Sequence, residues 1–86
     1  MKLFSITADL SKPYSEWEAG FISHQPKREA AGIVDVAHGK IEGQEAILVV
    51  LKAESQATLD AFMAAQGESI QENGHIMEST QITVAE

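Results

Sequence analysis

The strongest hydrophobic pattern in the chain is Glu45–Leu51, in which an unbroken apolar run follows a single glutamate. A run of this length is typical of a buried strand, and it has no polar face to turn toward water. Both faces of a sheet that contains it therefore need a cover. A chain of 86 residues has room for about two helices, which cover one face, so we predict that a second copy of the chain covers the other.

Alternating apolar and polar residues predict three further strands. Leu3–Asp9 is the first of them, Ile33–Ile41 the second, and His75–Val84 the last. The dipeptide Glu42-Gly43 indicates a tight turn, which would join the second strand to the apolar strand over Gln44–Lys52 as a hairpin.

The first predicted helix lies between the first two strands. Tyr14, Trp17, Phe21 and His24 follow one another at spacings of three and four, which places them on one helical face. The segment Ser15–Glu18 matches a capping box, so we expect the helix to begin there. Pro26 cannot donate the backbone hydrogen bond of a continuing helix, so a break is expected near His24, with a further turn before a Gly32 C-cap.

The second predicted helix begins after Ser55, whose hydroxyl suits an N-cap. Its end is indicated by Asn73-Gly74, a typical left-handed stop. The element order is therefore βαββαβ, which predicts an α+β, ferredoxin-like sandwich in which both helices cover one face of a four-stranded antiparallel sheet. We expect residues 1–86 to form one such domain, dimerising into an α+β barrel.

The composition excludes several classes of function. A formal net charge of −7, spread along the chain without a basic stripe, argues against nucleic-acid binding. The absence of cysteine removes disulfides and thiolate chemistry, and is consistent with the cytoplasm. The N-terminal residues alternate instead of forming an apolar run, so we expect no signal peptide, and no segment approaches the length of a membrane span.

The chain resembles the dimeric α+β barrel superfamily, which includes small proteins similar to antibiotic-biosynthesis monooxygenases. The resemblance extends over the whole chain, and it rests on the element order, the start Lys2–Thr7, the aromatic first helix and the Ala31–Ile33 entry to the second strand. It implies a homodimer formed through the sheet face. The superfamily contains monooxygenases, haem-degrading enzymes, isomerases and proteins without chemistry, so the resemblance implies no single function.

The catalytic residues of those enzymes do not carry over to this chain. The haem-degrading branch uses an asparagine on the first strand, a tryptophan on the second helix and a histidine near that helix's end. Here the corresponding positions hold Thr7, no tryptophan within Gln56–Glu72, and only His75. The quinone-forming branch takes its polar residues from several elements, whereas Trp17 and Arg28 both fall in the first helix. We therefore expect no cofactor.

The three histidines are the residues best suited to proton transfer near neutral pH. His24 would project into a pocket between the first helix and the sheet, or pack half-buried at the helix end. His38, two residues after Val36, would reach the same pocket, or mark a strand end or bulge. His75 is expected at the surface. The histidines share no short ligand spacing, so we predict no metal site.

Asp35 is a further catalytic candidate, because a carboxylate inside a strand requires an explanation. If Val34 and Val36 face the helices, Asp35 points toward the barrel interior or the dimer interface, where it needs a partner such as Lys52, Arg28 or a hydroxyl. Alternatively, it lies on an exposed edge and discourages aggregation.

A ligand pocket is predicted between the first helix and the sheet, lined by Trp17, Phe21, His24 and His38. Aromatic residues at helical spacing are equally what an ordinary core contains. Our main hypothesis is a homodimeric barrel protein that binds a small hydrophobic or aromatic ligand. The alternative is a cofactor-independent monooxygenase or isomerase in which His24 or His38 shuttles a proton. The sequence leaves open whether the protein is an enzyme.

Overall fold

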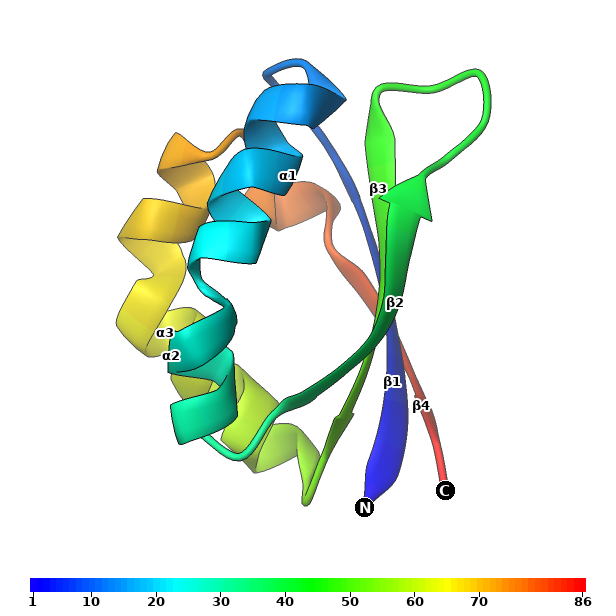
Figure 1. Ribbon diagram of the computed structural model, residues 1–86. Helices are drawn as coiled ribbons and strands as arrows, with labels where there is room; N and C mark the ends of the chain where they lie inside the picture. The colour runs from blue at the N-terminus through cyan, green and yellow to red at the C-terminus, as the bar shows by residue number, and fades with distance from the viewer.

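The computed structural model describes residues 1–86 throughout (Figure 1). In chain order its elements are β1 (Lys2–Asp9), α1 (Tyr14–Ser23), α2 (Gln25–Ala30), β2 (Val34–Lys40), β3 (Ala46–Ala53), α3 (Gln56–Glu72), the short 3₁₀ helix η1 (Met77–Ser79) and β4 (Gln81–Ala85).

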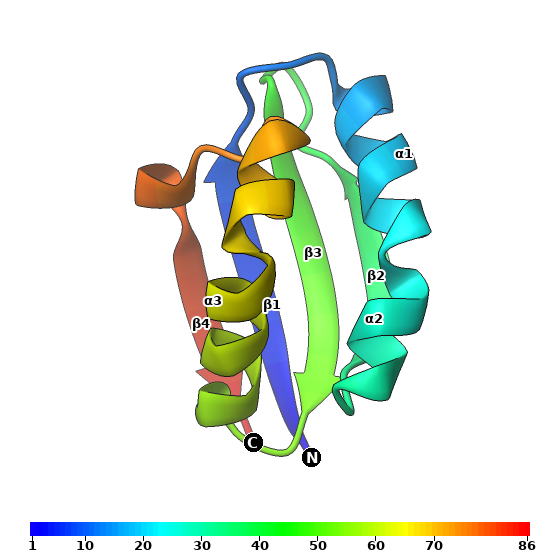
Figure 2. The same cartoon turned by 90° about the vertical axis from the view of Figure 1, so that its left-hand side faces the viewer.

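The elements form two layers. The strands make one antiparallel sheet in the order β2-β3-β1-β4. All the helices lie on one side of this sheet and leave its other side open (Figure 1). Turned by 90°, α3 lies in front of the β1–β4 half, and α1 and α2 lie in front of β2 (Figure 2). The predicted ferredoxin-like α+β sandwich is confirmed.

The hydrophobic core lies between the helices and the two central strands. Alternate residues of β1 and β3 point toward the helices, and the register pairs Phe4 with Leu51 and Ile6 with Val49. Trp17 of α1 and Leu59 of α3 close the core from the helical side, with 3% and 1% of their surfaces exposed. The period-two pattern of β1 is thus satisfied by one buried face.

The apolar run in β3 supplies both faces of the sheet. Val49 and Leu51 are buried under the helices, whereas Leu48 remains 38% exposed on the open side and Val50 is half-buried there. Leu3 of β1 is exposed on the same side. The prediction that this strand has two apolar faces is confirmed, and its second face is not covered by the chain itself.

The first helix breaks where proline predicts. His24 donates its backbone N–H to the Gly20 and Phe21 carbonyl oxygens and so ends α1, and α2 starts at the next residue with Pro26 in its first turn. In this first turn the missing N–H of proline costs no helical hydrogen bond. Gly32 then adopts φ 81°, the left-handed conformation expected of a residue just past a helix end.

The two helix starts differ in how well the sequence predicts them. Ser55 caps α3, because its hydroxyl accepts the Thr58 N–H at 3.3 Å, as predicted. The capping box over Ser15–Glu18 is wrong, since α1 begins one residue earlier after Pro13 without a side-chain cap from its own segment. The Tyr14 N–H instead donates to the Glu45 carboxylate at 3.1 Å, so the β2–β3 loop supplies the acceptor.

The last predicted strand is wrong in its first half. His75 makes only an isolated bridge to Leu10, and η1 follows before β4 begins at Gln81. The detour is stabilised by the Ser79 hydroxyl, which accepts the Asp9 N–H at 2.8 Å and so replaces a strand-to-strand bond. Local side-chain bonds of this kind compete with a sheet ladder.

None of the helices is both long enough and apolar enough to cross a lipid bilayer.

Candidate functional site

An apolar cavity of about 70 Å³ lies between the helices and the sheet. Ten of its fourteen lining residues are hydrophobic, among them Ile6, Trp17, Val49, Leu59, Phe62 and Met63. It is partly open to solvent, so it is a pocket in the core wall and not a sealed void. An engineered cavity of about 150 Å³ binds benzene, so this pocket has about half the volume of a cavity that holds a six-membered ring.

The rim of the cavity can adjust. Phe62 and Met63 lie on consecutive positions of α3, line the cavity and are only half-buried. A methionine side chain has three rotatable bonds and readily changes the space that it fills. A six-membered ring therefore fits only if the Met63 and Phe62 side chains rotate outward, and the flexibility of methionine allows such a rotation.

The polar residues of the cavity come from the C-terminal ends of α1 and α3 and from α2: His24, Arg28, Asn73 and His75. The two helices approach closely here, because the Asn73 side chain occupies the space that a Cβ atom on Gly20 would need. His24 lies one helical turn after Gly20, to which its N–H donates at 3.1 Å. The cavity thus has an apolar body and polar groups from converging helix ends.

His75 is one of these polar groups, and the sequence analysis placed it wrongly at the surface. Only 6% of it is exposed, and its Nε2 lies 2.7 Å from the Thr80 hydroxyl oxygen. Burial lowers the pKa of His75, because the charged imidazolium loses its hydration. No local motif indicates this burial, which arises from the packing of the C-terminal segment.

His24 lies at the end of α1, where it is half-buried and lines the cavity. Partial burial lowers the pKa of His24, and the nearby positive charges of Lys27 and Arg28 lower it further. The imidazole is therefore neutral at pH 7, so one ring nitrogen can accept a proton or hydrogen bond.

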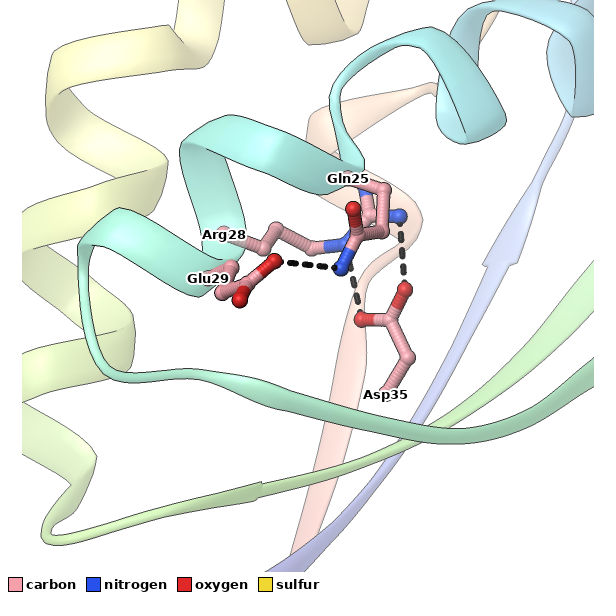
Figure 3. Close-up of polar contacts among 4 residues, drawn as sticks. All are labelled: Gln25, Arg28, Glu29 and Asp35. Atoms are coloured by element: carbon pink, nitrogen blue, oxygen red, sulfur yellow. Dashed lines mark hydrogen bonds and ion pairs between the residues drawn. The ribbon is translucent and has the colours of Figure 1, made fainter.

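Arg28 is almost completely buried and forms a bidentate ion pair with Asp35 (Figure 3). Arg28 Nε and Nη2 each donate to one Asp35 carboxylate oxygen at 2.8 Å. The guanidinium carbon lies 3.7 Å from the centre of the Phe21 ring, a cation–π contact. Beside the pair, Gln25 donates to Glu29 at 3.3 Å (Figure 3).

This ion pair corrects the predicted orientation of the second strand. Val34 lies opposite Lys52 on the open face, so the expectation that it faces the helices is wrong. Asp35 faces the helices instead, and of the partners considered for it the structure selects Arg28. The carboxylate neutralises a buried cation and joins α2 to the edge strand β2.

His38 belongs to a separate group along the seam between α1 and β2. Its Nε2 lies 3.0 Å from Glu18 Oε2, which also accepts the Tyr14 hydroxyl at 2.9 Å. Burial, and then the hydrogen bond to Glu18, raise the pKa of Tyr14 to about 12. The Tyr14 bond, followed by that to His38, lowers the pKa of Glu18. His38 also packs on Phe21, with ring centres 4.9 Å apart.

The predicted ligand residues are therefore only partly brought together. Trp17 and Phe21 are stacked, with ring centres 4.9 Å apart, and line the cavity together with His24. His38 packs behind Phe21 and contributes nothing to the cavity wall. Arg28, Asn73 and His75 line the cavity, although sequence reasoning did not assign them to it.

The side chains that line the cavity decide which chemistry it can support. No group of three or more histidine, cysteine, aspartate or glutamate side chains is placed to hold a metal ion. The cavity offers apolar walls and two imidazoles whose pKa values are lowered. Chemically, such a site can enclose the apolar body of a molecule and accept a proton or a hydrogen bond from a polar group that the molecule carries.

Comparison with known proteins adds the family and the fold. A family model described as "Domain of unknown function (DUF3764)" matches residues 1–85. A solved structure described as an antibiotic biosynthesis monooxygenase is 10% identical, with a TM-score of 0.62, and the alignment covers 100% of this chain and 97% of that one.

A second solved structure, described as a dimeric ferredoxin-like protein from an uncultured marine organism, is 15% identical. Its TM-score is 0.50, with coverage of 100% of this chain and 93% of that one. At these identities the two structures show a common fold, which confirms the resemblance inferred from the sequence. No curated protein matches the sequence.

Proposed function

Because the chain belongs to the DUF3764 family, a domain of unknown function, we propose its role from its geometry: it is a single-domain, homodimeric protein that binds a small hydrophobic molecule. The observation that carries this proposal is the apolar pocket of about 70 Å³ beside the core of a chain of only 86 residues. Apolar side chains that line an unfilled pocket forgo burial that would stabilise a small domain, about 25 cal/mol for each square ångström. Its presence is explained if a ligand fills it.

Trp17 provides a direct assay of this binding. It is the one tryptophan of the chain, it is 3% exposed, and its ring lines the cavity. Titration with toluene, excited at a wavelength that only tryptophan absorbs, is expected to change the Trp17 emission with a saturating curve. A linear response or no response up to the solubility of toluene would contradict the proposed site.

A matched pair of variants assigns the signal to the cavity. Val49→Ile adds one methyl group to the cavity wall, whereas Val36→Ile adds the same group to an exposed position of β2. We expect Val49→Ile to weaken toluene binding and Val36→Ile to leave it unchanged. Equal effects of the two substitutions would place toluene elsewhere.

The dimeric part of the proposal rests on the open face of the sheet. Leu3, Val34 and Leu48 are exposed there, and no helix covers them (Figure 1). Four strands of up to eight residues, at about 4.8 Å between strands and about 3.3 Å per residue, give a face of roughly 500 Å². That is the same order as the roughly 800 Å² per partner of a stable interface.

The solved structure described as dimeric supports a dimer of this chain as well, through its common fold. The open face carries Ser5, Thr7 and Lys52 beside these apolar residues. A second copy presents the same mixed face, which makes a two-fold contact self-complementary. The mass in solution at micromolar concentration tests this part, and a monomer would contradict it.

A cofactor-independent enzyme is the second candidate function, because His24 lies in the cavity wall and the pKa of His24 is lowered. Such a group can remove a proton from carbon beside a carbonyl. Deuterium exchange into cyclohexanone, followed by NMR, tests it: the protein should accelerate the exchange, and His24→Ala should abolish the acceleration. His38→Ala is the control, since His38 lies outside the cavity wall. No acceleration by the wild-type protein would remove this candidate.

A further inference from the structure

The polar groups of the cavity differ in whether their hydrogen-bonding capacity is already used. Arg28 gives two donors to Asp35 at 2.8 Å and packs against Phe21. His75 Nε2 is paired with Thr80 at 2.7 Å. Together these contacts hold two of the four polar residues of the cavity in place within the protein.

His24 and Asn73 are different, because their side chains line the cavity without a hydrogen bond to another residue of the chain. No fully buried side-chain nitrogen or oxygen lacks a partner, so the free polar atoms of these two residues remain accessible from the cavity or the solvent. A neutral imidazole and an amide each provide both donor and acceptor capacity.

The charges around the cavity are compensated. The buried Arg28 cation is matched by the Asp35 carboxylate in a bidentate pair. The cavity wall contains no other arginine, lysine or acidic residue. An anion that enters therefore meets an arginine whose charge is already neutralised by Asp35, and a cation finds no carboxylate in the wall. Burying either without a partner is costly.

We propose that the ligand of this cavity is an apolar molecule that carries one uncharged hydrogen-bonding group, a hydroxyl or a carbonyl, held by His24 and Asn73. This inference rests on the proposed function, since it specifies the ligand class of the same cavity. The apolar walls enclose the body of the molecule, and the two free polar side chains orient its polar group. Carboxylates and amines are excluded by the charge balance of the wall.

Four compounds of one scaffold test the inference: toluene, benzyl alcohol, benzoate and benzylammonium. Their dissociation constants are measured at pH 7.5 from Trp17 emission and from the chemical shifts of backbone amides. We expect benzyl alcohol to bind at least tenfold more tightly than benzoate and benzylammonium. A charged compound that binds as tightly as the alcohol would overturn the inference.

Two substitutions locate the polar contact. Asn73→Leu and His24→Phe each replace a polar side chain by an apolar one of similar size. Each is expected to weaken the affinity for benzyl alcohol about three- to tenfold and to change the affinity for toluene by less than about twofold. Two positions are used because Asn73 also packs against Gly20, so one variant alone could fail to fold. If both fold and neither changes the ratio of alcohol to toluene affinity, the inference is wrong.

The outcomes separate this inference from the proposed function. If toluene binds in the cavity and neither variant changes the ratio of benzyl alcohol affinity to toluene affinity, the proposed binding function remains supported and the predicted ligand class is wrong. Failure of all four compounds to bind removes the proposed function, and this inference with it.

Discussion

Leu48 and Val49 are neighbours in β3 that face opposite sides of the sheet, so the same substitution at each tests the layer arrangement. Leu48 is 38% exposed on the open face, whereas Val49 is 4% exposed under the helices. We expect Val49→Asp to unfold the subunit, and Leu48→Asp to leave the subunit folded and dissociate the dimer.

The magnitudes follow from burial. A chain of 86 residues has a stability of about 4–13 kcal/mol. Val49→Asp loses about 2 kcal/mol of apolar burial and buries a carboxyl group without a partner, which costs several kcal/mol more. The sum is comparable to the whole stability of the domain. Leu48→Asp removes about 2 kcal/mol of burial from each half of a two-fold interface, so the dimer should weaken by at least about a hundredfold.

The assay combines far-ultraviolet circular dichroism with sedimentation velocity at protein concentrations from about 1 to about 100 µM. The wild-type protein should sediment as a dimer with the spectrum of the folded protein. Leu48→Asp should keep that spectrum and sediment as a monomer, and Val49→Asp should lose it. A folded Val49→Asp would refute the assigned register of β3, and a Leu48→Asp dimer as tight as the wild type would refute the proposed interface.

Three further predictions concern stability. Asp35→Asn should lower the free energy of unfolding by about 2–3 kcal/mol, because it leaves the nearly buried Arg28 without its counter-charge, and urea denaturation checks this. The pKa of His75 is lowered on folding, so below pH about 6.5 the unfolded chain binds a proton that the folded chain does not, and the free energy of unfolding should fall. Urea denaturation at pH about 7.5 and about 5.5 should show this loss of stability, and His75→Gln should make the loss smaller. Gly20→Ala should destabilise the fold, because its methyl group meets the Asn73 side chain at the end of α3, whereas Gly67→Ala has open space around it and should stabilise the fold by about 0.5–1 kcal/mol. Thermal melts that rank the two variants in the reverse order would contradict the packing of α1 on α3.

The layer arrangement could be predicted because it depends on patterns longer than one turn or one strand pair. The apolar run of β3 indicated a strand with two apolar faces, and Pro26 indicated the end of α1. Such features act through local backbone chemistry and through burial of many residues together, so one misplaced residue does not change them.

The site was less predictable because it depends on a single irregularity in β2. The register shifts between Asp35 and Ala37, which places Val36 in a bulge. As a result, Asp35 and His38 both face the helices, although an odd spacing places residues of a regular strand on opposite sides. Counting by two from Val34 therefore gave the wrong side for Asp35.

His75 illustrates a second limit. Its burial requires the segment after Gly74 to pair with Leu10, the residue that follows β1, and its hydrogen bond requires η1 to return Thr80 to the imidazole. Both contacts arise from the tertiary arrangement of the C-terminal segment, whereas the alternating pattern of that segment favoured a continuous strand. The local pattern gave way to side-chain bonds of Ser79.

The central claim, that the cavity between the helices and the sheet is a ligand site, is tested most directly by intermolecular nuclear Overhauser effects to bound benzyl alcohol. The account predicts contacts from its ring protons to the methyl groups of Val49 and Leu59, which line the cavity. Contacts to Leu48 and Val34 instead would place the ligand on the open face of the sheet and contradict the account.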